Sequence, residues 1–402
     1  MSARFFWNSK RHKPARAAVA PPDQTPIAFH RRLPGYEPTP LVSVPELARV
    51  LGVGDVLLKV ESSRFGLPAF KILGASWAVY RALEARLGRI LGPWRTLEEL
   101  AQNLAPIRPI TLAAATDGNH GRAVARMAAL LQFQSRIYVP AGTAQARIDA
   151  IASEGAQVEV INGTYDQAVE RSARDAGERC LVISDTSWPG YEDVPRSVID
   201  GYSTIMSEID DELARRDEPG PEFIAVQFGV GALAAAVVKH YRAHRAAVQP
   251  GILSVEPLSA ACMLASMEAG EIVLVPGPHV SIMAGLNCGR PSIVAWPIVS
   301  TGIDGFIAVN DERAREAMRA LARVGIVAGE TGAAGLAGLL ELLTGPENEE
   351  RRAELHIDTA TRVLVFVTEG ATNPASYADI LSLSPTESSE SPGRAHGTLM
   401  MD

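Results

Sequence analysis

The sequence has few cysteines and no long apolar run. Its 402 residues include three cysteines, which are too few for a disulfide-based fold and lack the spacing of a zinc site. No stretch of about 20 apolar residues occurs, so we expect no membrane-spanning helix and no membrane partner. The apolar patch at the start of the chain is too short for a secretory signal. We therefore predict a cytoplasmic protein with a large core and no metal site.

An excess of positive charge is also absent. Lys and Arg total 38, Asp and Glu total 46, and the formal net charge is −8. Because proteins that bind nucleic acid neutralise phosphates with basic side chains, this balance argues against nucleic acid as the main partner. Hydrophobic residues make up 47% of the chain and charged residues 21%, which is typical of globular proteins and argues against a disordered chain.

The two ends of the chain differ in composition from the rest. Residues 1–26 are rich in Arg, Lys and Pro, and their first acidic residue is Asp23. We predict a flexible arm there, with an organelle transit segment as the alternative. Residues 384–402 contain Ser, Pro, Glu and Gly without an apolar period, and we predict a flexible tail.

Between these ends, short apolar runs alternate with stretches of helical period. Strands are expected at residues 56–60, 110–115, 135–139, 157–160, 180–183, 223–227, 251–255, 303–309 and 362–367. Helices are expected at residues 75–87, 121–131, 143–154, 165–176, 198–215, 232–247, 311–324 and 333–343. This alternation is typical of crossover units. It predicts an α/β fold with mainly parallel sheets flanked by helices.

The first candidate for chemistry is Lys71, which follows Arg64-Phe65-Gly66-Leu67 in an apolar segment. It stands close to the start of a predicted helix, where the helix dipole disfavours a cation. Partial burial would favour the neutral amine further, which is what a lysine that forms a Schiff base requires. Taken alone, Lys71 is better explained as an ordinary lysine at a helix start.

The second candidate is the turn Thr116-Asp117-Gly118-Asn119-His120-Gly121, between a predicted strand and a predicted helix. Such a turn presents backbone N–H groups to an anion, and the amide of Asn119 can donate to a ligand oxygen. An ordinary turn with a helix cap explains the segment equally well.

Two further segments also follow predicted strands. The glycine-rich turn Gln227-Phe228-Gly229-Val230-Gly231-Ala232-Leu233 could bind a phosphate through main-chain donors, although close packing alone would also explain it. It is no P-loop, because no Gly-Lys-Ser/Thr follows. Thr368 stands at the carboxyl end of the last predicted strand, where ligands bind in open α/β sheets. A helix N-cap is the alternative for Thr368.

In this order, the four segments resemble the fold-type II pyridoxal-phosphate enzymes, the tryptophan synthase β-like superfamily, and most closely the diaminopropionate ammonia-lyases. Further marks of that family are Asp185-Thr186-Ser187-Trp188, Gly190-Tyr191-Glu192, Ile282-Met283-Ala284-Gly285-Leu286 and Thr368-Glu369-Gly370. The resemblance covers residues 27–383. Pro68 and Ala75 depart from the Asn and Gly usual in the family, and Pro68 stiffens the approach to Lys71.

The resemblance implies two lobes with the cofactor, pyridoxal 5′-phosphate, between them. Residues 27–90 and 188–383 would form a large cofactor-binding lobe, and residues 91–187 a small inserted lobe. The resemblance also implies a homodimer.

Individual residues take their roles from the same resemblance. Lys71 would bind the cofactor covalently, Asn119 would contact its ring hydroxyl, and Thr368 would face its pyridine nitrogen. The main chain of five residues would bind its phosphate: Gly229, Val230, Gly231, Ala232 and Leu233.

The implied reaction is α,β-elimination of D- and L-2,3-diaminopropionate to pyruvate and two ammonia. Asp117 would take the α-proton of the D form and Asp185 that of the L form, since the two protons project to opposite faces of the cofactor. A helix cap and an Asx turn, respectively, are the structural alternatives for these two residues. A serine or threonine dehydratase, a β-replacement enzyme and a non-catalytic cofactor-binding protein are the alternative functions. Asp117 argues against the dehydratases, because simpler members of the superfamily carry Ser or Thr there.

A few other residues have structural interpretations. We expect His120 to support the turn beside Asn119 and Cys262 and Cys288 to be free thiols, although they could approach each other. Tyr165 is expected to pack in a core or loop. Thr331 could border the cofactor or cap a helix.

Overall fold

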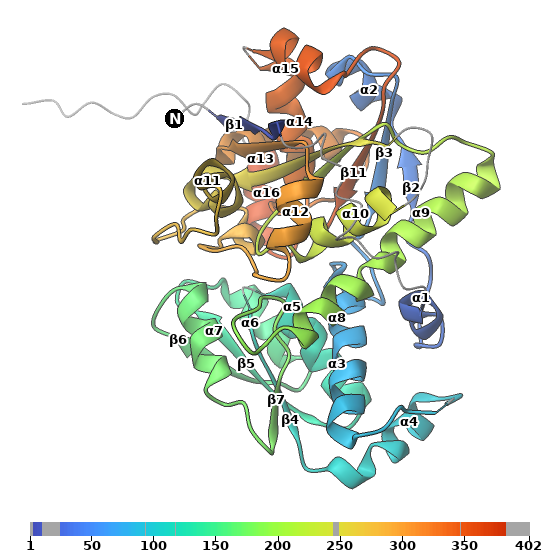
Figure 1. Cartoon of the computed structure of the whole chain (residues 1–402), viewed down its shortest axis with the longest axis vertical. Coiled ribbons are helices and arrows are strands. Elements are labelled where there is room, and N and C mark those ends of the chain that lie inside the picture. Colours follow the sequence, from blue (N-terminus) through green and yellow to red (C-terminus); the bar gives the residue numbers. More distant parts are fainter. Residues whose placement is uncertain are drawn as a thin grey trace, which may run out of the picture.

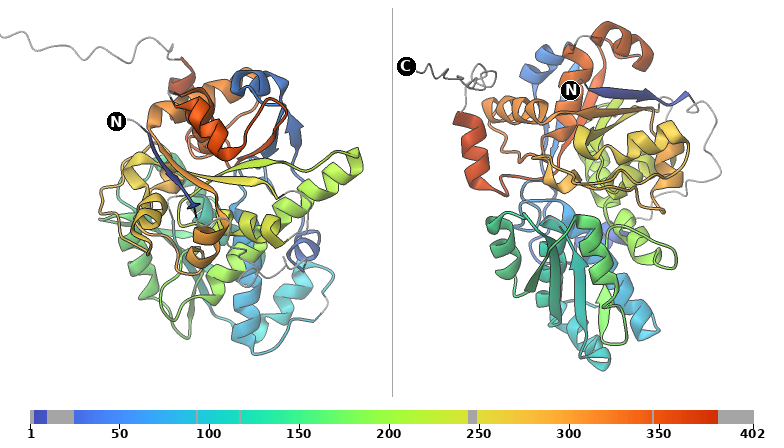
Figure 2. Two further views of the ribbon diagram at one scale, coloured as in Figure 1. Left: turned by 45° about the horizontal axis from the view of Figure 1, so that its top comes forward. Right: turned by 90° about the vertical axis from the view of Figure 1, so that its left-hand side faces the viewer.

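The computed structural model describes residues 3–9, 25–92, 94–116, 118–243, 249–345 and 347–382. It contains two β-sheets in separate bodies, one above the other (Figure 1). The same two bodies are distinct in the right-hand view of Figure 2. The strand order is β1-β10-β9-β8-β11-β3-β2 in the seven-stranded sheet and β6-β5-β4-β7 in the four-stranded sheet.

The central strands of both sheets are parallel, which confirms the expected α/β fold. The larger sheet consists of β1 (Arg4–Trp7), β2 (Leu41–Ser43), β3 (Asp55–Val60), β8 (Phe223–Gln227), β9 (Gly251–Pro257), β10 (Gly305–Val309) and β11 (Arg362–Val367). Its two edge strands, β1 and β2, are antiparallel to their neighbours. The smaller sheet consists of β4 (Thr111–Ala115), β5 (Gln134–Pro140), β6 (Gln157–Ile161) and β7 (Cys180–Val182), all parallel.

Helices cover both sheets (Figure 1). They are α1 (Thr25–His30), α2 (Pro45–Leu51), α3 (Lys71–Leu87), α4 (Leu97–Asn103), α5 (Asn119–Leu130), α6 (Gln145–Ala152), α7 (Tyr165–Ala173), α8 (Asp193–Gly201), α9 (Ser203–Arg216), α10 (Ala232–Ala243), α11 (Cys262–Ala269), α12 (Trp296–Gly302), α13 (Asp311–Arg323), α14 (Ala334–Thr344), α15 (Asn348–Leu355) and α16 (Pro374–Ser382). Within the described ranges, none of these helices is long and apolar enough to cross a membrane.

The interpretation of residues 1–26 as a flexible arm is wrong at its start, because Arg4–Trp7 form β1. This strand pairs with β10 at the edge of the larger sheet, and the Phe6 and Phe306 rings lie 6.2 Å apart. The run of three aromatic residues suits a half-buried strand, which explains why it joins the sheet. Residues 1–2 and 10–24 of the predicted arm and all of the predicted tail, residues 384–402, lie outside the described residues. Residues 25 and 26 of the predicted arm belong to α1.

The helix expected at 198–215 is in fact two helices, α8 and α9. The break follows Gly201, where the chain passes close to α3: a Cβ on Gly201 would lie 2.6 Å from the Leu73 carbonyl oxygen. The last residues of the helix expected at 232–247 lie partly outside the described part of the chain, and α10 is described to Ala243.

One buried apolar cluster spans the two sheets, and two further clusters each lie on one sheet. A single cluster of buried side chains includes Leu57 of β3, Ile224 of β8 and Leu112 of β4. α3, which the sequence interpretation assigns to the large lobe, runs beside the smaller sheet (Figure 1). The division into lobes at residues 91 and 187 stays a prediction.

His30 gives the fold a testable pH dependence. It is fully buried, with Nδ1 2.7 Å from Thr204 Oγ1 and Nε2 3.0 Å from the Leu73 carbonyl oxygen. Burial is the main reason why the pKa of His30 falls from 6.5 to about 3. Between these values the unfolded chain binds a proton that the folded protein does not. The stability that neutral His30 contributes is therefore fully present above pH 6.5 and is lost as the pH falls toward 3.

We expect this group to lower the free energy of unfolding by about 2 kcal/mol between pH 7 and pH 5. The variant His30→Gln should be less stable at pH 7 but should lose about 2 kcal/mol less over the same interval, measured by urea denaturation. The exposed control His356→Asn should keep the wild-type pH dependence. An equal loss in wild type and His30→Gln would contradict the assignment.

Candidate active site

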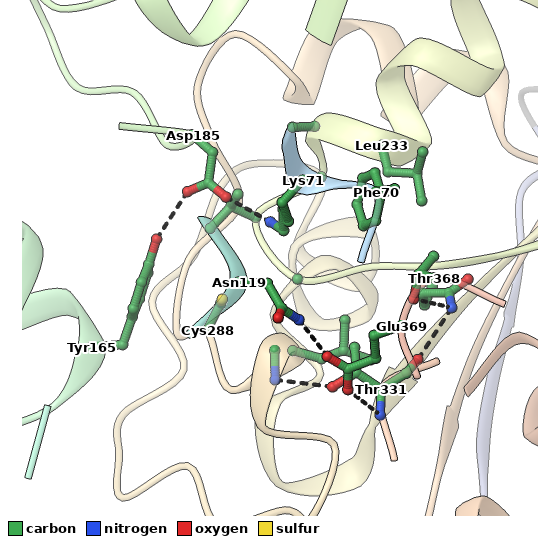
Figure 3. Close-up of a pocket in the computed structure, with 17 residues that line it drawn as sticks. Phe70, Lys71, Asn119, Tyr165, Asp185, Leu233, Cys288, Thr331, Thr368 and Glu369 are labelled. Carbon is green, nitrogen blue, oxygen red and sulfur yellow. Dashed lines mark hydrogen bonds and ion pairs between the residues drawn. The ribbon is translucent and has the colours of Figure 1, made fainter. Parts of the chain in front are cut away.

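Adjacent parallel strands bring the candidate residues together at their carboxyl ends. β4 pairs with β7 in the smaller sheet, and β11 pairs with β8 in the larger one. Asn119 and Asp185 therefore follow neighbouring strands, as do Gly229 and Thr368. Both pairs line one pocket between the two sheets (Figure 3).

All the candidate residues that the structure describes line this pocket. They are Lys71, Asn119, Asp185, Gly229, Val230, Gly231, Ala232, Leu233 and Thr368. Asp117 lies outside the described residues, so its assignment stays a prediction.

Lys71 and Asp185 form an ion pair in the pocket. Lys71 begins α3, and its Nζ lies 2.7 Å from Asp185 Oδ2. The hydroxyl of Tyr165, from α7, donates to Asp185 Oδ1 at 3.1 Å. Both carboxylate oxygens of Asp185 are therefore engaged by groups that face the pocket (Figure 3).

The pKa of Asp185 is set by two opposing causes. Burial acts to raise this pKa, while the charges of Lys71 and His120 and the bonds from Lys71 and Tyr165 lower it. The lowering causes prevail, so the pKa of Asp185 lies well below its ordinary value and the group is ionised at neutral pH.

A buried ion cluster anchors the segment that precedes Lys71. Guanidinium nitrogens of Arg64 lie 2.6 Å from Glu61 Oε1 and 2.6 Å from Glu208 Oε1. Lys59 Nζ lies 2.7 Å from Glu208 Oε2. Two cations and two carboxylates balance here, and pairing offsets the cost of burying them.

The turn at residues 229–233 requires glycine. Gly231 has φ +100°, and a Cβ there would lie 2.6 Å from the Phe228 ring. A Cβ on Gly229 would lie 3.0 Å from the Gly285 carbonyl oxygen. α10 begins at Ala232, and the first N–H groups of a helix have no partner within the helix. The turn therefore places main-chain donors at the pocket wall, as an anion site requires.

A hydrogen-bond chain connects the two sheets across the pocket. Asn119 Nδ2 donates to Glu369 Oε2, and the backbone N–H of Thr331 donates to Glu369 Oε1 at 3.2 Å. The hydroxyl of Thr331 in turn accepts from the backbone N–H of Gly285 at 3.1 Å. Asn119 is thus held by a carboxylate from the larger sheet (Figure 3).

Thr368 is held at the end of β11 by Gln227, the last residue of β8. Gln227 Nε2 donates to Thr368 Oγ1 at 2.9 Å and to the Phe366 carbonyl oxygen at 3.1 Å. The next helix begins only at Pro374, so the helix-cap interpretation of Thr368 is wrong. The hydroxyl of Thr368 lies in the pocket wall.

Comparison with known proteins identifies the family. A family model described as "Pyridoxal-phosphate dependent enzyme" matches residues 32–368. The diaminopropionate ammonia-lyase of Salmonella typhimurium (strain LT2) is 36% identical over 368 residues, which cover 88% of this chain and 90% of that protein. The chain belongs to the diaminopropionate ammonia-lyase family. The Escherichia coli K12 member is 35% identical over 359 residues, which cover 88% of this chain and 89% of that protein.

Solved structures agree with this membership. The diaminopropionate ammonia-lyase of Escherichia coli, in complex with an aminoacrylate-PLP azomethine reaction intermediate, matches with a TM-score of 0.85 and 32% identity. The match covers 95% of this chain and 97% of that one. Threonine deaminase isoform 2 from Solanum lycopersicum has a TM-score of 0.67 at 20% identity and shares the fold alone. The fold is that of the fold-type II enzymes, as expected.

The residues of the pocket fit the cofactor that gives the family its name. A lysine amine, an amide, a hydroxyl and a glycine turn that a Cβ would obstruct all meet there. The amine suits a carbonyl carbon, the amide suits a ring oxygen, the hydroxyl suits a ring nitrogen, and the turn suits a phosphate.

The other sequence interpretations have mixed outcomes. Tyr165 packs against a buried cluster of the smaller sheet, as expected, but it also lines the pocket and its hydroxyl contacts Asp185. The structural role expected for His120 stays a prediction; its Nε2 lies 2.8 Å from the Ile183 carbonyl oxygen. Cys262 and Cys288 are not joined in a disulfide.

Several residues that line the pocket have no role in the sequence interpretation. They are Phe70, Gln227, Gly285, Leu286, Cys288 and Glu369. For Phe70, Gln227 and Glu369, the position beside a strand end or the lysine is the signal that could have identified them. Thr331 borders the pocket, as one of its two interpretations proposed.

The glycine turn makes a prediction about cofactor affinity. Gly231→Ala puts a side chain at positive φ and against Phe228, a strain of about 1–3 kcal/mol that falls on the phosphate site. We expect pyridoxal phosphate to bind at least about tenfold more weakly, measured by absorbance titration of the cofactor-free protein. Gly220→Ala is the matched control, since no atom lies within 4 Å of a Cβ there. Equal affinity in the two variants would contradict the assignment of the turn.

Proposed function

We propose that this protein catalyses the elimination of D- and L-2,3-diaminopropionate to pyruvate and two ammonia. The observation that carries the proposal is the contact of Lys71 Nζ with Asp185 Oδ2 at 2.7 Å, in a pocket that also holds a glycine turn and Asn119. Lys71 thus offers an amine that can bind a carbonyl cofactor, and the carboxylate of Asp185 contacts the nitrogen of that amine. The family's 35–36% identical members carry the name of this activity.

The residues that would hold pyridoxal phosphate are the lysine, the turn, the amide and the hydroxyl. Lys71 would bind it covalently, residues 229–233 would bind its phosphate, Asn119 its ring hydroxyl and Thr368 its pyridine nitrogen. When bound, pyridoxal phosphate withdraws electrons from the α-carbon of an amino acid. A neutral hydroxyl at the ring nitrogen suits elimination, because the departing β-amine removes the negative charge quickly.

Among the residues that the structure describes, Asp185 has the carboxylate that contacts Lys71 Nζ and can move a proton there. Its low pKa depends on the charge of Lys71, while burial alone would raise that pKa. Once the lysine nitrogen loses its charge, Asp185 becomes a stronger base. We assign to Asp185 the α-proton of the L substrate, with Tyr165 holding the carboxylate in place.

Asp117 is assigned the α-proton of the D substrate by its place in the turn before Asn119. The α-protons of two enantiomers project to opposite faces of a planar cofactor, so one base cannot serve both. A carboxylate at either face can also hold the cationic β-ammonium of diaminopropionate, which serine lacks.

The proposal extends to the state of the protein in the cell. We propose a cytoplasmic homodimer whose small lobe, residues 91–187, closes on the substrate. Size-exclusion chromatography with light scattering tests the dimer directly.

Comparing substrates tests the function. Purified protein with pyridoxal phosphate is offered D- and L-diaminopropionate, D- and L-serine and L-threonine, and pyruvate or 2-oxobutyrate release is followed. We expect both diaminopropionate enantiomers to be turned over well above serine. A preference for serine or threonine would favour the dehydratase alternative, and no turnover with the cofactor bound would favour a non-catalytic protein.

A further inference from the structure

Glu369 lies in the pocket wall with its backbone fixed on two sides. Glu369 forms an isolated antiparallel β-bridge with Ala69, two positions before Lys71. The backbone carbonyl oxygen of Glu369 accepts from the Gly329 N–H at 3.0 Å. A Cβ on Gly332 would lie 2.3 Å from that same carbonyl oxygen. Glu369 is 2% exposed, so its carboxylate has little freedom to move.

The carboxylate of Glu369 can only accept hydrogen bonds while it is ionised. It accepts from Asn119 Nδ2 with one oxygen and from the Thr331 N–H with the other. An asparagine amide has a carbonyl side and an N–H side, and a carboxylate tolerates only the N–H side. Glu369 therefore fixes which way the Asn119 amide faces, and leaves the second N–H of the same nitrogen for another acceptor.

We propose that Glu369 is a positioning residue that turns an N–H of Asn119, rather than its carbonyl, toward the phenolic oxygen of the cofactor. This rests on the proposed function, in which Asn119 contacts that oxygen. An N–H stabilises a phenolate, whereas a carbonyl oxygen repels it. The orientation of one amide thus decides whether Asn119 supports the cofactor or opposes it.

The isosteric variant Glu369→Gln isolates this role. The Thr331 N–H keeps the glutamine carbonyl oxygen on its side, so the glutamine N–H group faces Asn119 and favours the reversed amide. We expect pyridoxal phosphate to bind about tenfold more weakly. The visible absorbance of the bound cofactor should titrate at higher pH, because the phenolate loses a donor.

Asn119→Ala, the double variant and two further variants complete the test. Asn119→Ala should change both readouts in the same direction, and the double variant should be no worse than Asn119→Ala alone. Glu369→Asp keeps an acceptor-only group and should keep the wild-type titration pH. Glu330→Gln is the matched control. Glu330 is buried and precedes Thr331, but its carboxylate accepts from Ser376 Oγ at 2.6 Å and not from Asn119.

The outcomes separate this inference from the proposed function. If Asn119→Ala leaves both readouts unchanged, the role of Asn119 in the proposed function fails, and this inference with it. If Asn119→Ala changes both readouts and Glu369→Gln changes neither, only the role of Glu369 is overturned. Additive effects in the double variant, or an equal titration shift in Glu369→Asp, would show a packing role and overturn it as well.

Discussion

Replacing Lys71 with alanine is expected to reduce pyruvate formation from diaminopropionate by about 10³-fold or more. Lys71 is the one group in the described pocket wall with an amine, and its Nζ lies 2.7 Å from Asp185 Oδ2. Alanine removes both the covalent anchor and a proton carrier at this atom. The measurement is kcat by pyruvate release, with cofactor binding followed by absorbance.

Lys239→Ala is the control for Lys71→Ala. Lys239 pairs with Asp200 on α8 and is also partly buried, but it does not line the pocket. We expect Lys239→Ala to retain wild-type kcat. A Lys71→Ala protein that folds and keeps more than about a tenth of the wild-type kcat would contradict a covalent role for this lysine.

Exchanging the two aspartates for asparagine is expected to split the enantiomers. Asp185→Asn should lower kcat for the L substrate by about 10²–10⁴-fold and affect the D substrate much less. Asp117→Asn should have the opposite effect, because each base serves one face of the cofactor. The measurement is kcat and KM for each enantiomer separately.

A control variant and the cofactor spectrum make this split decisive. Asp175→Asn removes a carboxylate near the smaller sheet that pairs with Arg136 and Arg171 away from the pocket, and it should leave the enantiomer ratio unchanged. Asp185→Asn also removes the partner of Lys71, so retained cofactor absorbance must accompany the loss. Equal losses for both enantiomers in each variant would contradict separate bases.

The buried strands were the most predictable part of the fold. The prediction for 223–227 coincides with β8, and that for 362–367 with β11. Strands covered on both faces read as apolar runs bounded by turn residues, so their pattern is local. β1 and β2 were missed because they are short antiparallel edge strands, and their pairing with β10 and β3 is decided by distant parts of the chain.

The site residues that directly follow a strand could be predicted from the sequence. Asn119, Thr368 and the 229–233 turn were identified because strand ends are where ligands bind. The contacts between segments were not predictable: Glu369 meets Asn119 across 250 residues of sequence. Tyr165 stands in α7, and its helical pattern gave no sign that its hydroxyl would reach Asp185.

The most direct test of the proposed reaction is the ratio of ammonia to pyruvate released from each diaminopropionate enantiomer. Elimination of the β-amine followed by hydrolysis releases two ammonia for each pyruvate, whereas serine would release one. We expect a ratio of two with both the D and the L substrate. A ratio of one, or no pyruvate while the cofactor is bound, would contradict the proposed elimination.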